Sequence, residues 1–224
     1  MKDSVDGIGY CFRDAGLLQE ALTHRSAGAI NNERLEFLGD SILNTVVSIR
    51  LFERHPEAAE GDLSRMRARL VRGSTLGDLA MEIGLGRELH LGEGERKSGG
   101  FRRSSILADA FEALIGAIFL DGGYAACQEV VLGFFDPLID SLPDAEELKD
   151  SKTRLQEWLQ GRGRPLPEYR LHSEEGADHA KKFFIRCRLT DQAREVEASG
   201  SSRRKAEQAA AKLMLDALSD RGAA

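Results

Sequence analysis

Two pairs of acidic residues lie inside apolar stretches that have the periodicity of helices. Glu36 and Asp40 occur in NERLEFLGDSIL, and Asp109 and Glu112 occur in SSILADAFEALIGAIFL. The spacings are i,i+4 and i,i+3, so each pair projects from one face of its helix. Ionised carboxylates are costly to bury unless a cation or a donor offsets their charge. The pattern therefore favours a fold in which two helices build an oxygen-only site for a hard divalent cation.

The alternative interpretation is that these acids are ordinary solvated charges on amphipathic helices. That is the usual explanation for a single acidic pair. It is weaker here because apolar residues flank the acids in both stretches. These neighbours are Leu35, Phe37, Leu38, Ile42 and Leu43 in the first stretch and Phe111, Leu114 and Ile115 in the second.

Charge is divided unevenly along the 224-residue chain. Residues 1–148 carry 15 Lys and Arg against 25 Asp and Glu, a balance of −10. Residues 149–224 carry 16 against 12, a balance of +4. A basic segment that follows an acidic body predicts that the smaller part contacts a polyanion, while the larger part has another task.

The cysteines and the hydropathy pattern indicate the compartment. Cys11, Cys127 and Cys187 are scattered and odd in number, which argues against a disulfide framework or a zinc ribbon and suits a reducing compartment. The first residues lack the apolar core of a signal peptide, and no apolar run approaches the roughly 18 residues of a membrane span. We therefore expect a cytoplasmic protein with no membrane segment.

The first two thirds of the chain have the pattern of an all-helical domain. Apolar residues recur with helical spacing, and the segments end at glycines or prolines. The glycine-rich, charged segment 92–103 has no period and is predicted to be a loop. The predicted helices cover residues 17–23, 33–54, 60–71, 74–83, 105–120 and 124–142.

The pattern changes after the acidic, polar stretch PDAEELKDS, which is typical of a linker. Beyond it, alternating residues predict strands between two helices. These elements cover residues 153–160, 168–172, 183–189, 195–199 and 202–218. The sequence thus predicts a multi-domain chain, with an all-α domain at 1–147 and a small α+β domain of order α-β-β-β-α at 148–220.

The stretch NERLEFLGDSIL resembles the signature of the ribonuclease III family. The resemblance continues through EGDLSRMRARLVR, GGFRRSSILADAFEALIGAIFLD, TRLQEWLQ and GSSRRKAEQAAA. These motifs cover nearly the whole chain in the family's order. The resemblance implies an all-helical endonuclease domain, a linker and one double-stranded-RNA-binding domain.

The resemblance also implies the roles of the four acids. Glu36, Asp40, Asp109 and Glu112 would surround catalytic Mg²⁺, with Mn²⁺ as a substitute, and Asp40 and Glu112 are the expected catalytic residues. A carboxylate-held Mg²⁺ suits the hydrolysis of a phosphodiester, in which negative charge builds on the oxygens. The chain offers no rival catalytic motif, since its five histidines are dispersed and HExxH, GxSxG and Walker-type sequences are missing.

Three further residues of the helical domain receive roles from the resemblance. Glu33 and Glu60 would support the acidic valley, although each could instead serve the first turn of its helix, where negative charge is favourable. Phe37 would contact a second subunit, because the family's endonuclease domain works as a homodimer. From the sequence alone, packing of Phe37 in the core is an equal alternative.

The last third resembles double-stranded-RNA-binding modules, which read A-form shape through phosphates and 2′-hydroxyls over roughly 16 base pairs. The implied contacts come from the first helix, a turn between strands and the start of the last helix. These residues are Gln156, Glu157, Gln160, His179, Ser202, Arg203, Arg204 and Lys205. The alternative for the basic cluster is a solvated helix start. Glu207 stands where many such modules have lysine, which would weaken or redirect one phosphate contact.

The sequence therefore predicts a homodimeric, Mg²⁺-dependent endoribonuclease that cuts double-stranded RNA. The resemblance implies 5′-phosphate and 3′-hydroxyl products with short 3′ overhangs, and roles in ribosomal-RNA precursor processing and in messenger-RNA processing and decay. An alternative function is a non-catalytic double-stranded-RNA-binding protein that keeps the helical domain as a dimerisation scaffold. A decayed site would have lost some of the acids, and all four are present.

Overall fold

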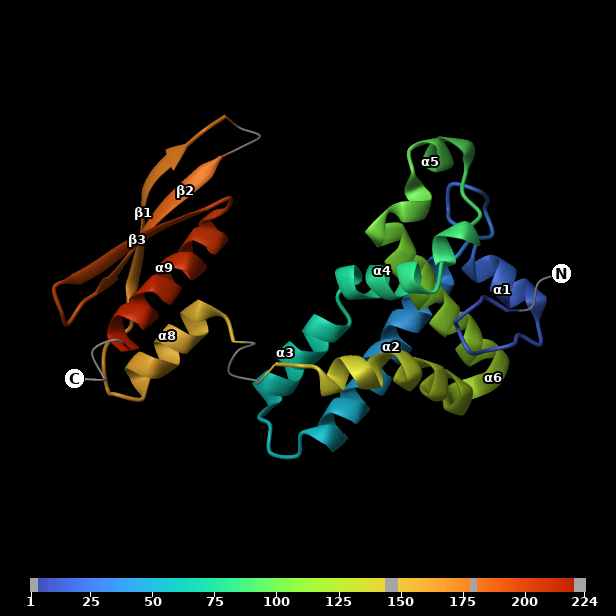
Figure 1. Cartoon of the computed structure of the whole chain (residues 1–224), viewed down its shortest axis with the longest axis horizontal. Coiled ribbons are helices and arrows are strands. Elements are labelled where there is room, and N and C mark those ends of the chain that lie inside the picture. Colours follow the sequence, from blue (N-terminus) through green and yellow to red (C-terminus); the bar gives the residue numbers. More distant parts are fainter. Residues whose placement is uncertain (1–3, 144–148, 178–180, 220–224) are drawn as a thin grey trace. The chain divides into compact units, whose positions relative to one another are not determined.

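The chain forms two compact units, residues 1–143 and residues 144–224 (Figure 1). The structure is a computed structural model that describes residues 4–143, 149–177 and 181–219. The predicted boundary between residues 147 and 148 falls outside the described residues and stays a prediction. Among the helices of the described ranges, none has the length and apolar character needed to cross a membrane.

The first unit is all-helical in its described residues, as predicted. Helix α2 has the predicted ends, and most other ends shift by one or two residues. Its elements are α1 (Ala15–Ala21), α2 (Glu33–Arg54), α3 (Glu60–Leu70), α4 (Gly73–Glu82), η1 (Leu85–Arg87), α5 (Glu93–Lys97), η2 (Gly100–Arg102) and α6 (Ser104–Asp140).

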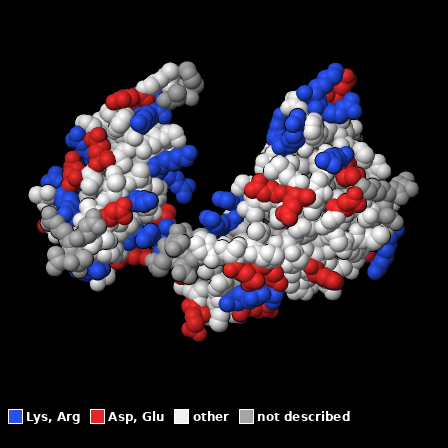
Figure 2. Space-filling view, viewed as in Figure 1, with Lys and Arg blue, Asp and Glu red and all other residues white. Residues whose placement is uncertain are grey.

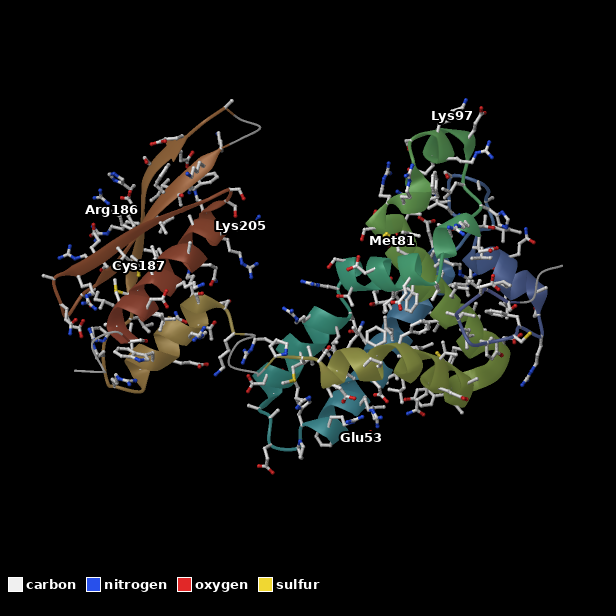
Figure 3. All side chains as sticks on the ribbon, viewed as in Figure 1. Glu53, Met81, Lys97, Arg186, Cys187 and Lys205 are labelled. Atoms are coloured by element: carbon white, nitrogen blue, oxygen red, sulfur yellow. The ribbon has the colours of Figure 1, made fainter. Side chains whose placement is uncertain are left out.

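The prediction of a loop over residues 92–103 is wrong, because α5 and η2 lie within it. Both elements are single turns, too short to produce a hydrophobic period. Helix α5 is held by a local ion pair between Lys97 Nζ and Glu93 Oε1 at 2.6 Å. Lys and Arg side chains gather at this end of the unit (Figure 2), and Lys97 projects from its tip (Figure 3).

Helix α6 corresponds to the two helices predicted at 105–120 and 124–142. Its helical path is broken at Gly123, whose φ of 78° favours glycine over other residues. The part of α6 before the break is buried nearly all round, from Ile106 to Ile118. A helix that is apolar on every side belongs at the centre of a domain, and α2 packs directly against it.

The second unit has the predicted order α-β-β-β-α. Its elements are α8 (Ser151–Gln160), β1 (Glu168–Glu175), β2 (Lys182–Leu189), β3 (Arg194–Gly200) and α9 (Arg203–Ser219). The strands form an antiparallel sheet of order β1-β2-β3, with an irregular register between Leu171 and Ser173. Both helices lie over one face of the sheet (Figure 1).

Alternation along β2 explains how this unit closes its core. Ile185, Cys187 and Leu189 point to the helical side and are buried, in the period of two that a half-covered strand shows. They pack with Leu155 and Leu159 of α8 and with buried residues of α9, which are Ala206, Ala210, Ala211, Met214, Leu215 and Leu218. The opposite face of α8 is therefore left for solvent or a partner.

Candidate functional site

Two glycines bring the acidic stretches together. A Cβ on Gly39 would overlap the carbonyl oxygen of Glu112, and a Cβ on Gly116 would overlap the carbonyl oxygen of Leu35. Helices α2 and α6 therefore cross with their backbones in contact. Gly39 directly precedes Asp40, and Gly116 lies one turn after Glu112, so the acids of both helices meet at this crossing.

Three of the four predicted metal ligands form a tight group. Glu36, Asp109 and Glu112 each offer an oxygen, and these oxygens lie within 4.8 Å of one another. Asp40 lies outside that group and is exposed, and its Oδ1 accepts a hydrogen bond from Asn44 Nδ2 at 2.8 Å. It is nevertheless close enough for its charge to act on Glu112.

The electrostatics of the group show a shortage of positive charge. Burial, followed by the charges of Asp40, Glu36 and Asp109, raises the pKa of Glu112 to about 8. Burial is also the main cause that raises the pKa of Glu36 and of Asp109. Each carboxyl would ionise more readily with a cation beside it. This demand, and a donor set made only of oxygens, fits a hard divalent metal ion.

Glu36 and Asp109 open onto a cleft of about 490 Å³ that also contains cations and hydrogen-bond donors. Its lining residues are His24, Arg25, Ser26, Asn32, Glu33, Glu36, Glu95, Arg103, Ser105, Ile106 and Asp109. Arg103 Nη1 pairs with Glu95 Oε1 at 2.7 Å, and Arg25 Nη1 with Glu33 Oε1 at 3.4 Å. In such a cleft the carboxylates can hold a metal ion, and the arginines can attract an anionic substrate to it.

The two supporting acids lie in different places. Glu33 is in the first turn of α2 and lines the cleft, and its charge contributes to the raised pKa of Glu36. Glu60 begins α3, where it accepts a hydrogen bond from Ser64 Oγ at 2.9 Å. It lines a separate hollow of about 820 Å³, so a single chain does not bring it to the cleft.

Phe37 is 79 % exposed, so core packing, the alternative from sequence, is wrong. Two other apolar residues of α2 are also open to solvent, since Phe52 is 71 % and Ile49 is 40 % exposed. Ile49 and Phe52 line the hollow that contains Glu60. Helix α2 therefore presents acids to the cleft and apolar side chains to the outside. The interface role of Phe37 stays a prediction.

In the second unit, the polar residues predicted on α8 avoid the core. Leu155 and Leu159 are buried, whereas Glu157 and Gln160 are exposed and Gln156 is half-buried. Glu157 Oε2 accepts a hydrogen bond from Lys149 Nζ at 2.7 Å. The three residues are thus available to a ligand on the face of α8 opposite the leucines. The predicted contact His179 lies outside the described residues.

The predicted basic cluster forms the start of α9. Ser202 Oγ accepts a hydrogen bond from Lys205 N at 3.2 Å, which is the contact of a helix-capping residue. Arg203, Arg204 and Lys205 are exposed, and Lys205 extends away from the helix (Figure 3). Arg203 Nη2 pairs with Glu174 Oε1 at 2.6 Å. A positive helix start with flexible cations is an anion-binding feature.

Glu207 has a structural partner. Its Oε2 lies 2.7 Å from Lys152 Nζ, and the neighbouring Gln208 Oε1 accepts a hydrogen bond from Lys152 N at 3.1 Å. These contacts join the start of α8 to the first turns of α9. The expected effect of Glu207 on a phosphate contact stays a prediction.

Sequence reasoning missed the donors that line the cleft. His24, Arg25 and Ser26 precede the acidic stretch, and Arg103 is the last residue of the segment predicted as a loop. No local period marks these residues. A signal was available only for the helix crossing, where a glycine within each acidic helix, Gly39 and Gly116, allows a close backbone approach.

Known proteins match this arrangement over most of the chain. A ribonuclease-III-like family model matches residues 14–138, and a double-stranded RNA binding motif model matches residues 151–218. Ribonuclease 3 of Shewanella amazonensis is 55 % identical over 94 % of this chain and 93 % of that protein. Ribonuclease 3 of Hahella chejuensis is 54 % identical over the same shares.

A solved nuclease domain of ribonuclease III from Campylobacter jejuni, described by its flexibility in a region involved in dimer formation, superposes with a TM-score of 0.57. It is 42 % identical and covers 58 % of this chain and 92 % of its own. The chain therefore belongs to the ribonuclease III family, the endoribonucleases that cut double-stranded RNA.

Proposed function

We propose that this endoribonuclease uses Mg²⁺ held by Glu36, Asp109 and Glu112, with Asp40 beside them. The observation that carries the proposal is the group of three carboxylates at the edge of a cleft that also holds arginines. When bound, the ion offsets negative charge on the phosphodiester and lowers the pKa of water. Mn²⁺ should substitute, because it takes the same oxygen ligands.

The chain's own residues hold and orient the reacting groups. Asn44 fixes one oxygen of Asp40, which directs that carboxylate beside Glu112. Arg25 and Arg103 supply positive charge to the phosphodiester across the cleft. Water attacks phosphorus in line, the bond from phosphorus to the 3′ oxygen breaks, and that oxygen takes a proton. The proposed products are therefore a 5′-phosphate and a 3′-hydroxyl.

The proposed assembly is a homodimer through the outer face of α2. Exposed apolar side chains beside an apolar hollow are typical of an interaction surface, and Ile49 and Phe52 supply them here. Phe37 is exposed on the same helix and lines another hollow. Glu60 lines the hollow of Ile49 and Phe52, so a second copy that covers it would place Glu60 at the interface. Two active sites in one dimer would cut both strands of a duplex and leave short 3′ overhangs.

The proposed duplex contacts are the exposed face of α8 and the start of α9. Gln156, Glu157 and Gln160 can reach 2′-hydroxyls in a minor groove, while Arg204 and Lys205 can neutralise phosphates. His179 is the expected third contact. The cellular roles that we propose are ribosomal-RNA precursor processing and messenger-RNA processing and decay in the cytoplasm, since precursors and messages fold into duplex segments.

The test is cleavage of a long RNA duplex and of a single strand of the same sequence, each with and without Mg²⁺. We expect cuts in the duplex only, and only with the metal ion. The matched variant is Glu112→Gln, which keeps the size of the side chain and removes its charge. Equal cleavage of both RNAs, or duplex cleavage in chelator, would overturn the proposal.

A further inference from the structure

The turn at residues 22–26 is built into the wall of the cleft by a second segment. His24 N donates to His90 O at 3.0 Å, and His90 N donates to Leu22 O at 2.9 Å. Gly92 N donates to Ser26 Oγ at 2.9 Å, and a Cβ on Gly92 would overlap the carbonyl oxygen of Ser26. The two segments are thus in backbone contact, and the ring of His24 is carried on a supported turn.

Ser26 fixes the tautomer of His24. The backbone N–H of Ser26, which can only donate, lies 3.2 Å from His24 Nδ1. Ser26 Oγ lies 2.8 Å from the same nitrogen, and because it accepts from Gly92 N, its own proton is available to His24. A ring nitrogen that accepts two hydrogen bonds carries no proton. The proton of the neutral ring is therefore on Nε2.

The ring of His24 is half-buried, lines the cleft and lies near Asp109. Asp109 lines the same cleft, and although burial raises the pKa of Asp109, a positive charge on His24 would lower it. Among the described residues, His24 Nε2 has no hydrogen-bond partner. Asn32 lines the same cleft at 2 % exposure, and its Nδ2 also lacks a partner within the described part of the chain.

His24 and Asn32 thus line a cleft that also contains the carboxylates of Glu36 and Asp109, and of the two donors only His24 Nε2 is outside the buried part of the wall. A carboxylate-held cation attracts the oxygens of a phosphodiester, and such an oxygen is the acceptor that His24 Nε2 lacks. Negative charge on the non-bridging oxygens must be stabilised as the bond to the attacking water forms. A fixed N–H directed at that position lowers the barrier more than it tightens substrate binding.

We propose that His24 donates a hydrogen bond from Nε2 to a non-bridging oxygen of the scissile phosphodiester, and that Ser26 is a positioning residue that holds the ring in the donating tautomer. No proton is transferred in this interaction. The inference rests on the proposed function, because it needs the scissile phosphate to lie in this cleft.

The test compares His24→Gln with His24→Asn. The amide nitrogen of glutamine reaches the place of Nε2, so His24→Gln keeps the donor to the phosphate. Asparagine reaches only the place of Nδ1, so His24→Asn keeps an acceptor for Ser26 and loses that donor. We expect His24→Asn to lower kcat by about 10- to 100-fold with little change in KM, and His24→Gln to stay within about fivefold of wild type.

His90→Asn is the matched control, since His90 supports the turn through its backbone, and thermal unfolding of each variant checks the fold. A purely structural role for the ring would give the reverse order, with His24→Asn active and His24→Gln impaired. That order, or wild-type kcat in His24→Asn, would overturn the inference. Failure of the wild-type enzyme to cut duplex with Mg²⁺ would instead overturn the proposed function.

Discussion

Gly39 of α2 and Glu112 of α6 are in backbone contact, so close that a methyl group on Gly39 would occupy the position of the Glu112 carbonyl oxygen. The same crossing places Gly116 against Leu35. The distance between the two acidic pairs is thus set by main-chain packing rather than by long side chains. The spacing of the two helices therefore cannot change unless main-chain atoms move.

The first prediction concerns this contact. Gly39→Ala should lower the free energy of unfolding by at least about 2 kcal/mol, because the added methyl group forces the helices apart in a packed core. Cleavage should fall further than stability alone explains, since the carboxylates separate. Thermal unfolding and the cleavage rate, both measured with Mg²⁺, test this.

Gly133→Ala is the matched control for that substitution. Gly133 also lies in a helix, but a Cβ there has no neighbour within 4 Å. It should stabilise the protein by about 0.5–1 kcal/mol, the usual gain for Gly to Ala inside a helix. If Gly39→Ala stabilised the protein as Gly133→Ala does, that result would contradict the close contact between α2 and α6.

The second prediction separates cleavage from binding. Glu112→Gln should reduce cleavage at least about 100-fold, since it removes a proposed metal ligand without changing side-chain size. The affinity for duplex RNA should stay within about twofold of wild type, because affinity comes mainly from Lys and Arg side chains that contact phosphates. Gel-shift titration and cleavage assays on one preparation provide the two measurements. Near wild-type cleavage would show that Glu112 is not a ligand.

The third prediction is a pH dependence of the metal-free protein. The folded state raises the pKa of Glu112 from its usual 4.5 to about 8. Between these values the unfolded chain has lost the proton and the folded chain keeps it, so stability falls as pH rises from about 5 to about 8. The melting temperature, recorded over that range in chelator, should decline for wild type and decline less for Glu112→Gln.

Mg²⁺ should reverse that trend. Because the ion needs the ionised carboxylate, it must displace the proton, and its stabilising effect should grow between about pH 6 and about pH 8. The pairing of Asp136 with Arg50 lowers the pKa of Asp136. The stability that this pairing gives is lost only at acid pH, so it does not change the melting temperature in this window. A stabilising effect of Mg²⁺ that is constant with pH would contradict the assignment of Glu112.

The fourth prediction tests the interface. Phe37→Ala should weaken dimerisation by at least about 10-fold, because it removes an exposed aromatic side chain of the kind that anchors interfaces. The free energy of unfolding of the separate chain should change little. Sedimentation velocity over a concentration series gives the dissociation constant. Met81→Ala, at another exposed apolar residue (Figure 3), is the control and should not alter association.

The fifth prediction concerns the salt dependence of duplex binding. Arg204→Ala and Lys205→Ala should each reduce the logarithmic salt slope by roughly 0.9, the value per phosphate for duplex DNA taken as a guide. Arg203→Ala should cost less, because Arg203 must first leave Glu174. Arg170→Ala removes an exposed arginine of β1 that pairs with Glu168, and it should leave the slope unchanged. Equal slopes for all variants would exclude α9 as the phosphate contact.

The periodicity of the sequence predicts an element correctly where contacts between neighbouring residues determine the structure. The period of Leu35, Ile42, Val46 and their neighbours predicts α2 with its observed ends, and the alternation along β2 predicts the buried face of the sheet. The period around Asp109 likewise predicts a buried helix. The family, the fold class and the endoribonuclease activity, all inferred from motifs, agree with the comparisons.

The sequence pattern could not predict which distant segments come together in the fold. His24 lies far from Asp109 in sequence, and only the pairing of residues 22–26 with residues 90–92 brings its ring to the cleft. Glu60 belongs to a motif of the acidic domain, yet α3 places it in another hollow. The elements α5 and η2 are single turns, too short to produce a hydrophobic period, so their residues resembled a loop.

The ion pair between Lys152 and Glu207 has a consequence for which duplex geometries the domain can bind. It ties the start of α8 to α9, so the two proposed RNA-contacting segments keep a constant spacing before any ligand arrives. Two contact segments at a fixed spacing accept only duplexes whose grooves match that spacing. The domain loses little conformational entropy on binding. It would bind A-form RNA, whereas the wider groove spacing of B-form DNA would match it poorly.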